Sequence, residues 1–216
     1  MAWKIFIRAS FPLVVITLLL YSGNANSHSE IGLSPRTTVI LKEFPTEPAL
    51  FKTEFRPYIQ KIIEKHGNEE WKACILTNEF HRHLGMWSII GAKMGIRARE
   101  ILEAPFDELD VVSFAGFKQP LSCINDGLQV STGASLGRAA ITVAHIGQPA
   151  AIFLYANKKI TLKVKPEISK EIGAIIQELS QKYKFQSPKY FEELDKKAIE
   201  TWLKWDRKKI FEELLD

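Results

Sequence analysis

The stretch Ala150-Ala-Ile-Phe-Leu-Tyr-Ala-Asn-Lys-Lys-Ile-Thr-Leu-Lys-Val164 decides the fold of this chain. Two apolar runs, Ala150 to Tyr155 and Ile160 to Val164, flank a short polar turn, which is the pattern of a β-hairpin. Two more strands are predicted before it, at Asp110 to Ala115 and Ala139 to Val143. The middle of the chain therefore predicts a mainly antiparallel sheet.

Helical patterns surround these strands. Apolar residues recur at helical spacing on both sides of the sheet. The predicted helices run from Glu54 to about Lys65, from Asn68 to Asn78, from Leu84 to about Glu103, from Cys123 to Val130, from about Glu167 to Lys184, and from Pro188 to Leu214. Strands in the middle with helices on either side predict an α+β domain.

The N-terminus carries the signature of an export signal. Two basic residues, Lys4 and Arg8, precede the apolar stretch from Phe11 to Tyr21, and small residues follow. Residues 1–25 are therefore predicted to be a signal peptide, which makes the protein periplasmic or extracellular. The apolar stretch is shorter than the about 20 residues that span a bilayer, so no membrane span is expected after signal removal. An uncleaved N-terminal anchor is the alternative.

The rest of the chain is expected to form one domain. It divides into an extended N-terminal segment (28–53), a core (54–166) and a helical extension of the same domain (167–216). Loss of the signal peptide lowers the formal net charge from +4 to +2. Basic residues alternate with acids along the helices, as on a solvated surface, and no basic block suggests a nucleic-acid partner.

The chemistry is concentrated in two blocks, Phe80-His-Arg-His-Leu-Gly85 and Ser122-Cys-Ile-Asn-Asp-Gly-Leu-Gln-Val-Ser-Thr-Gly133. Imidazole and thiolate are ligands that zinc prefers, and three protein ligands with an open fourth position are typical of catalytic zinc. His81 and His83, at i and i+2, share a face only if the chain between them is not helical. The predicted ligands are His81, His83 and Cys123. In the alternative, one histidine forms hydrogen bonds at the start of the helix and the other is a core residue.

Asp126 lies one turn after Cys123 on the same predicted helix. It is predicted either to orient a ligand histidine or to act as a base on a metal-bound water. Its other reading is a carboxylate that stabilises the helix N-terminus. The glycine loop that follows offers backbone amides and hydroxyls to a carbonyl or anionic group, with Arg138 as counter-charge. Thr132, Gly133, Ser135 and Arg138 are the predicted cofactor-binding residues, unless the loop is a simple turn.

These blocks resemble the FmdE family, which takes its name from a component of formylmethanofuran dehydrogenase. That family carries a His-Gly-His-Leu segment and a second block similar to Ser122–Arg138. The family's glycine between the histidines is Arg82 here, and its C-terminal cysteine-rich zinc finger is absent, with two helices in its place. The resemblance covers about residues 75 to 165. It implies a metal site but not the reaction of the enzyme complex that gives the family its name.

Three functions remain open from the sequence. The first is an exported, zinc-dependent enzyme that acts on an unknown small molecule. The second is a non-catalytic carrier of a metal or a metal-bearing cofactor. The third is a structural protein in which Cys74 and Cys123 form a disulfide, which an exported chain permits. The glycines of the Leu84–Glu103 helix would let another backbone approach closely, which makes a homodimer reasonable.

Overall fold

The computed structural model describes residues 39–215. The predicted signal peptide and the first part of the predicted extended segment lie outside the described residues. Within residues 39–215, no helix has the length and apolar character needed to cross a membrane.

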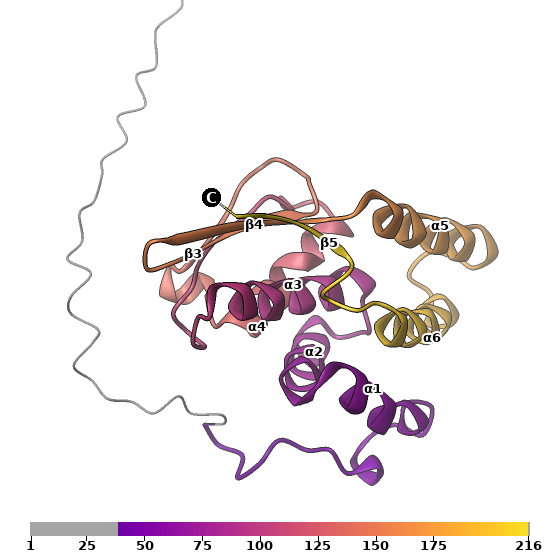
Figure 1. Cartoon of the computed structure of the whole chain (residues 1–216). Helices are drawn as coiled ribbons and strands as arrows, with labels where there is room; N and C mark the ends of the chain where they lie inside the picture. Colours follow the sequence, from indigo (N-terminus) through magenta and orange to yellow (C-terminus); the bar gives the residue numbers. More distant parts are fainter. Residues whose placement is uncertain (1–38, 216) are drawn as a thin grey trace, which may run out of the picture. The chain divides into compact units, whose positions relative to one another are not determined.

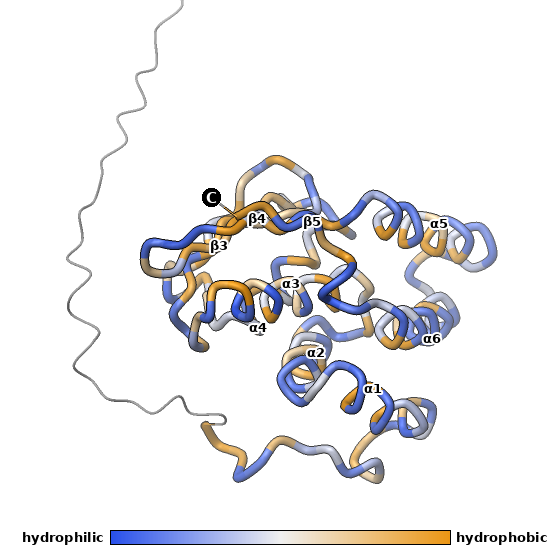
Figure 2. Tube along the Cα trace, in the orientation of Figure 1, coloured by the Kyte–Doolittle hydropathy of each residue, from blue (hydrophilic) through white to orange (hydrophobic). Residues whose placement is uncertain are grey.

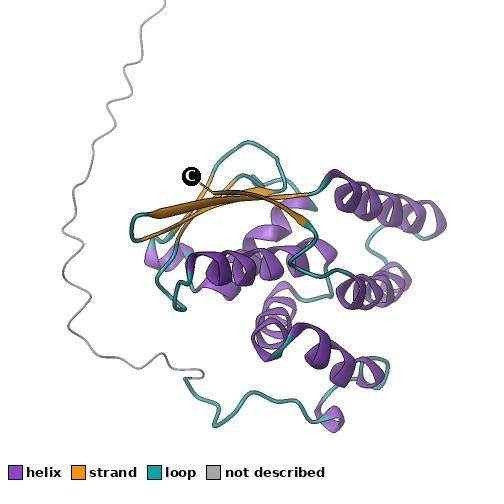
Figure 3. Ribbon diagram, viewed as in Figure 1, coloured by secondary structure: helices purple, strands orange, loops and turns teal. Residues whose placement is uncertain are grey.

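The described chain folds into six α-helices and five strands (Figure 3). The helices are α1 (Ile59–His66), α2 (Asn68–His81), α3 (Met86–Leu102), α4 (Ile124–Thr132), α5 (Pro166–Lys182) and α6 (Pro188–Lys204). The strands are β1 (Asp110–Ser113), β2 (Ile141–Val143), β3 (Ala150–Tyr155), β4 (Lys158–Val164) and β5 (Phe211–Leu215). Four short 3-10 helices occur at Pro48–Leu50, Arg56–Tyr58, Leu121–Cys123 and Leu136–Arg138.

The strands form one sheet in the order β2-β1-β3-β4-β5. β1 and β2 are parallel, and the other neighbouring strands of the described sheet are antiparallel. The hairpin predicted at residues 150–164 is present, with Tyr155 opposite Lys158. The prediction of an α+β fold with a mainly antiparallel sheet is confirmed.

The helices are layered on one face of this sheet. α3 and α4 lie next to the strands, and α2 and α1 follow beyond them (Figure 1). α3 is buried along almost its whole length, which explains its apolar sequence. α5 and α6 pack against each other beside these layers, and hydrophobic and hydrophilic residues alternate along both (Figure 2).

Glycines let α3 and α4 approach each other closely. A Cβ added at Gly91 would overlap the Ile124 carbonyl, and one at Gly127 would overlap the Ser88 carbonyl. Glycine is required where two backbones meet at this distance. The predicted close approach is therefore present, but the partner is α4 of the same chain. The glycine face that made a homodimer reasonable is occupied.

Two expectations are corrected by the structure. The last helix was predicted to run from Pro188 to Leu214, but α6 ends at Lys204 and β5 then joins the sheet beside β4. The predicted alternative of a disulfide is wrong, because Cys74 is buried on α2 and both cysteines are free. The reading of the protein as a disulfide-stapled structural domain loses its basis.

Candidate functional site

His81 is the last residue of α2, and the chain reverses directly after it. Arg82 adopts a left-handed backbone conformation with φ 72°, and its N–H donates to the Asn78 carbonyl at 2.9 Å. Such a conformation favours glycine. This explains why the glycine of the His-Gly-His motif suits the position that Arg82 occupies here. The non-helical link required for His81 and His83 to share a face is present.

The loop after α2 is fixed by one buried amide. Asn78 Oδ1 accepts hydrogen bonds from the Gly85 N–H at 3.0 Å and from Ser88 Oγ at 2.9 Å. Asn78 Nδ2 in turn donates to the Cys74 carbonyl at 2.7 Å. The start of α3 is thereby tied to the end of α2, and the loop that carries His83 is held between them.

A carboxylate orients the His81 ring. The Nδ1 atom of His81 lies 2.7 Å from Oδ2 of Asp126, which is in the first turn of α4. Burial would lower the pKa of His81, but the hydrogen bond with Asp126 and the nearby Cys123 and Asp126 side chains outweigh burial and raise it to about 9. Because the α3–α4 packing sets the position of α4, it also sets the position of this carboxylate.

The other ring nitrogen of His81 is left without a partner. Nε2 is buried and has no hydrogen-bond partner of acceptable geometry among the described residues. The thiol of Cys123, at the N-cap of α4, is near enough to influence the ring but does not satisfy this atom. Buried polar atoms in folded proteins nearly always have a partner. The Nε2 atom therefore remains available to a further partner.

His83 lies against His81. Their ring centroids are 4.3 Å apart, and His83 also contacts Phe191 at 5.0 Å. Burial and the positive charge on His81 lower the pKa of His83 to about 4. His83 is therefore neutral at neutral pH, which is the form in which imidazole binds a metal. His81, whose pKa is raised, has to release a proton before it can bind one. Among residues 39–215, however, no group of three or more His, Cys, Asp or Glu side chains is already arranged to hold a metal ion.

A cavity of about 370 Å³ opens next to these groups. His81, His83 and Cys123 line one part of it. Most of the remaining lining is apolar, and five of these side chains come from α5, α6 and the loop between them: Ile176, Phe185, Tyr190, Phe191 and Leu194. The sequence did not identify these five residues as part of a site, because helical periodicity indicates only that such side chains pack, not what they pack against.

The predicted cofactor-binding residues lie at the other end of α4. Thr132 Oγ1 donates to the Leu128 carbonyl at 2.6 Å and accepts from the Ala134 N–H. Gly133 ends α4 with φ 78°, and Arg138 pairs with Asp107. Ser135 precedes a short 3-10 helix. None of these predicted residues lines the described cavity, so the structure does not bring them together with the histidines.

The fold and the site define a class of α+β protein in which a cluster of histidine, thiol and carboxylate side chains lies beside a largely apolar cavity. The profile of the family described as "FmdE, Molybdenum formylmethanofuran dehydrogenase operon" matches residues 80–212, more than half of the chain. The protein therefore belongs to the FmdE family. The match continues through α6 into β5, further than the sequence blocks alone suggested.

A similar solved structure is the crystal structure of a tungsten formylmethanofuran dehydrogenase FmdE-like protein from Syntrophus aciditrophicus. It shares 15% sequence identity, covers 81% of this chain and 77% of its own, and has a TM-score of 0.38. The comparison with curated proteins found no match.

Proposed function

We propose that this member of the FmdE family is an exported, metal-dependent enzyme that acts on a small molecule. His81, His83 and Cys123 would hold a transition metal, with zinc as the expected ion. The observation that carries the proposal is the His81 ring, whose Nδ1 is held by Asp126 while its buried Nε2 has no partner among the described residues.

The donor set fits zinc. Metal-binding histidines usually hydrogen-bond through their other ring nitrogen to a carboxylate, as His81 does to Asp126. Cys123 stands at the N-terminus of the nine-residue helix α4, where the helix dipole favours a negatively charged ligand. The three donors line one cavity. To bind one metal ion together, their side chains would have to turn toward a common point.

The metal ion, Asp126 and the cavity walls would each contribute to the proposed reaction. A bound zinc ion would supply Lewis-acid polarisation of a substrate oxygen or activation of water. Asp126 fixes the orientation of the His81 ring, so its role is positioning rather than free base chemistry. A ligand seated against the apolar walls would displace water, which would strengthen electrostatic interactions inside the site.

Elemental analysis of the protein purified without chelator tests the metal site. We expect about one zinc-like ion per chain, lost in His81→Ala and Cys123→Ser. His145→Ala, which removes an exposed histidine outside the cavity, should keep the metal. Wild-type protein that holds no metal after incubation with zinc would refute the site.

Asp126→Asn should weaken zinc binding by about 10- to 100-fold, because the His81 ring would lose its orienting partner.

The same preparation separates an enzyme from a carrier. A carrier would pass its zinc rapidly to a chelator and show no turnover in a substrate screen. An enzyme would retain zinc through many turnovers.

Export is supported by the sequence from Met1 to Ala25. N-terminal sequencing of protein recovered outside the cytoplasm should give a chain that starts near residue 26. A full-length chain that stays in the cytoplasm would refute export.

A further inference from the structure

The cavity beside His81 is lined by few groups that could satisfy a charged ligand. Of its described lining residues, none is Lys, Arg, Asp or Glu, and the titratable ones are His81, His83, Cys123 and Tyr190. Gln119 and Gln186 contribute the side-chain amides. Burial of a charge without a counter-charge costs much free energy. The lining therefore disfavours an ammonium group, and any charge in the apolar part of the cavity away from His81.

The apolar side has a continuous aromatic wall. Ring contacts connect His81 to His83 (4.3 Å), His83 to Phe191 (5.0 Å), Phe191 to Tyr190 (5.7 Å) and Tyr190 to Phe185 (5.3 Å). Phe185 is 59% exposed, which places it at the rim, whereas Tyr190 is 3% exposed. The wall thus runs from solvent to the histidines. Aromatic faces and edges pair well with other flat rings.

We propose that the cavity binds a small molecule with an uncharged, flat aromatic body and one polar, non-cationic group directed at His81 and Cys123. The volume of about 370 Å³ is at the lower end for small-molecule pockets, which limits the ligand to at most about three rings. This inference rests on the proposed function, because it names the substrate class of the same site.

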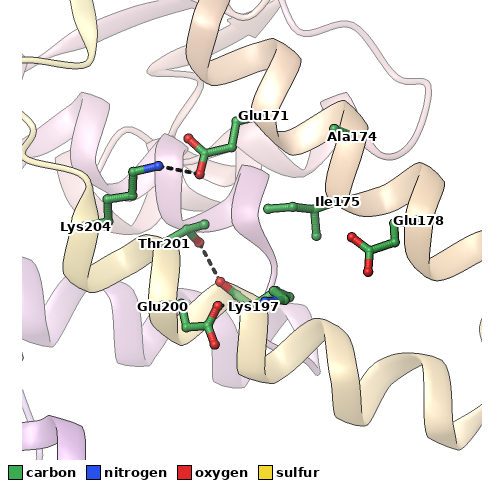
Figure 4. A pocket seen from close by; sticks show the side chains of 8 residues that line it. All are labelled: Glu171, Ala174, Ile175, Glu178, Lys197, Glu200, Thr201 and Lys204. Carbon is green, nitrogen blue, oxygen red and sulfur yellow. Dashed lines mark hydrogen bonds and ion pairs between the residues drawn. The ribbon is translucent and has the colours of Figure 1, made fainter.

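A neighbouring groove has the opposite chemistry and supplies the control. Between α5 and α6, Figure 4 shows Glu171, Glu178 and Glu200 near Lys204 and Lys197. Lys204 pairs with Glu171 at 2.7 Å and Lys197 with Glu200 at 2.9 Å. Ile175 lines this charged groove, whereas its neighbour on α5, Ile176, lines the aromatic cavity.

The test uses the fluorescence of N-phenyl-1-naphthylamine, a neutral aromatic probe, with the full chain after removal of metal by a chelator. The probe should bind the wild type. Ile176→Glu should weaken binding about tenfold or more, because it buries a charge in the cavity, and Ile175→Glu should change it by less than about twofold. Phe185→Ala, at an exposed position that the fold tolerates, should weaken it by a smaller factor.

Ligand charge is tested with two molecules of one shape. We expect 2-naphthylmethanol to displace the probe at a concentration about tenfold or more below that of 2-naphthylmethylammonium. Equal or better displacement by the ammonium ion, no binding of the probe, or equal loss in the two isoleucine variants would overturn the proposal. Since the measurement needs no metal, failure of the zinc site would appear only in the elemental analysis, and the two failures remain distinguishable.

Discussion

At the scale of single residues, Gly85 controls where the His81 ring can lie. A Cβ at Gly85 would be 3.1 Å from both Nε2 and Cδ2 of His81 and 2.7 Å from Ser88 Oγ. The backbone of Gly85 has φ −104°, which any residue adopts, so substitution acts through contact alone. The absence of a side chain here thus keeps space for the histidine that the proposed metal site needs.

Gly85→Ala is therefore expected to displace the His81 ring while the fold is retained. Zinc affinity should fall about tenfold or more, because metal sites tolerate little misplacement of a ligand. Competition with a chromogenic chelator measures the affinity, and circular dichroism checks the fold. Gly137→Ala, whose Cβ would meet nothing within 4 Å, is the matched control. Unchanged zinc affinity in Gly85→Ala would show that the ring is not held as the structure indicates.

At the scale of elements, most helices and strands follow from local patterns, and the end of α6 does not. Residues 205–210 are not helical, and Arg207 in this segment bonds to residues outside α6. Its guanidinium donates to the His66 carbonyl at 2.8 Å and to Glu70 at 3.1 Å. These partners are more than 130 residues away in sequence. Periodicity reflects only near neighbours, so it extended the helix to Leu214.

The candidate site, too, could be predicted from the sequence only in part. His81, His83, Cys123 and Asp126 were found because two short blocks carry unusual residue types. The aromatic cavity wall was missed, because Phe191 and its neighbours look like ordinary amphipathic residues and only the α5–α6 packing brings them to the histidines. The sequence therefore located the side chains of the proposed metal site but not the cavity walls beside them.

The elements are also joined by a buried charge that the sequence pattern assigned to the surface. Lys93 of α3 is fully buried, and its Nζ donates to Glu70 of α2 at 2.5 Å and to the Trp205 carbonyl at 2.7 Å. Trp202 of α6 donates to the same Glu70 oxygen at 3.0 Å. One ion pair thus connects α2, α3 and the end of α6.

Lys93→Met should destabilise the protein by about 3 kcal/mol, because it leaves the buried Glu70 charge with one cationic partner fewer. Arg207 still contacts Glu70, which keeps the loss near the lower end of the range for broken buried pairs. The change is measured as the free energy of unfolding in urea. Lys197→Met removes an exposed pair with Glu200 and should cost less than about 1 kcal/mol. Equal losses in the two variants would contradict the structural role of the buried pair.

At the scale of the whole molecule, the charges between α3, β5 and the α6–β5 segment couple stability to pH. Glu100 accepts from Arg207 at 2.6 and 2.9 Å and from Arg97 at 3.3 Å, and Arg97 also binds Glu213 of β5. Burial would raise the pKa of Glu100, but the two guanidinium groups outweigh it and lower the pKa below 4.5. The folded state therefore binds fewer protons than the unfolded state as pH falls below about 4.5.

The stabilisation from Glu100 should be fully present above about pH 4.5 and should be lost as pH falls through the lowered pKa of the folded state. Urea midpoints measured between about pH 3 and 7 test this. Glu100→Gln should have a lower midpoint at neutral pH and a shallower decline in acid than the wild type. Glu103→Gln, which removes an 82% exposed carboxylate on the same helix's end, should follow the wild-type curve. If Glu100→Gln instead runs parallel to the wild type at all pH values, Glu100 does not link the C-terminal segment to the core through its charge.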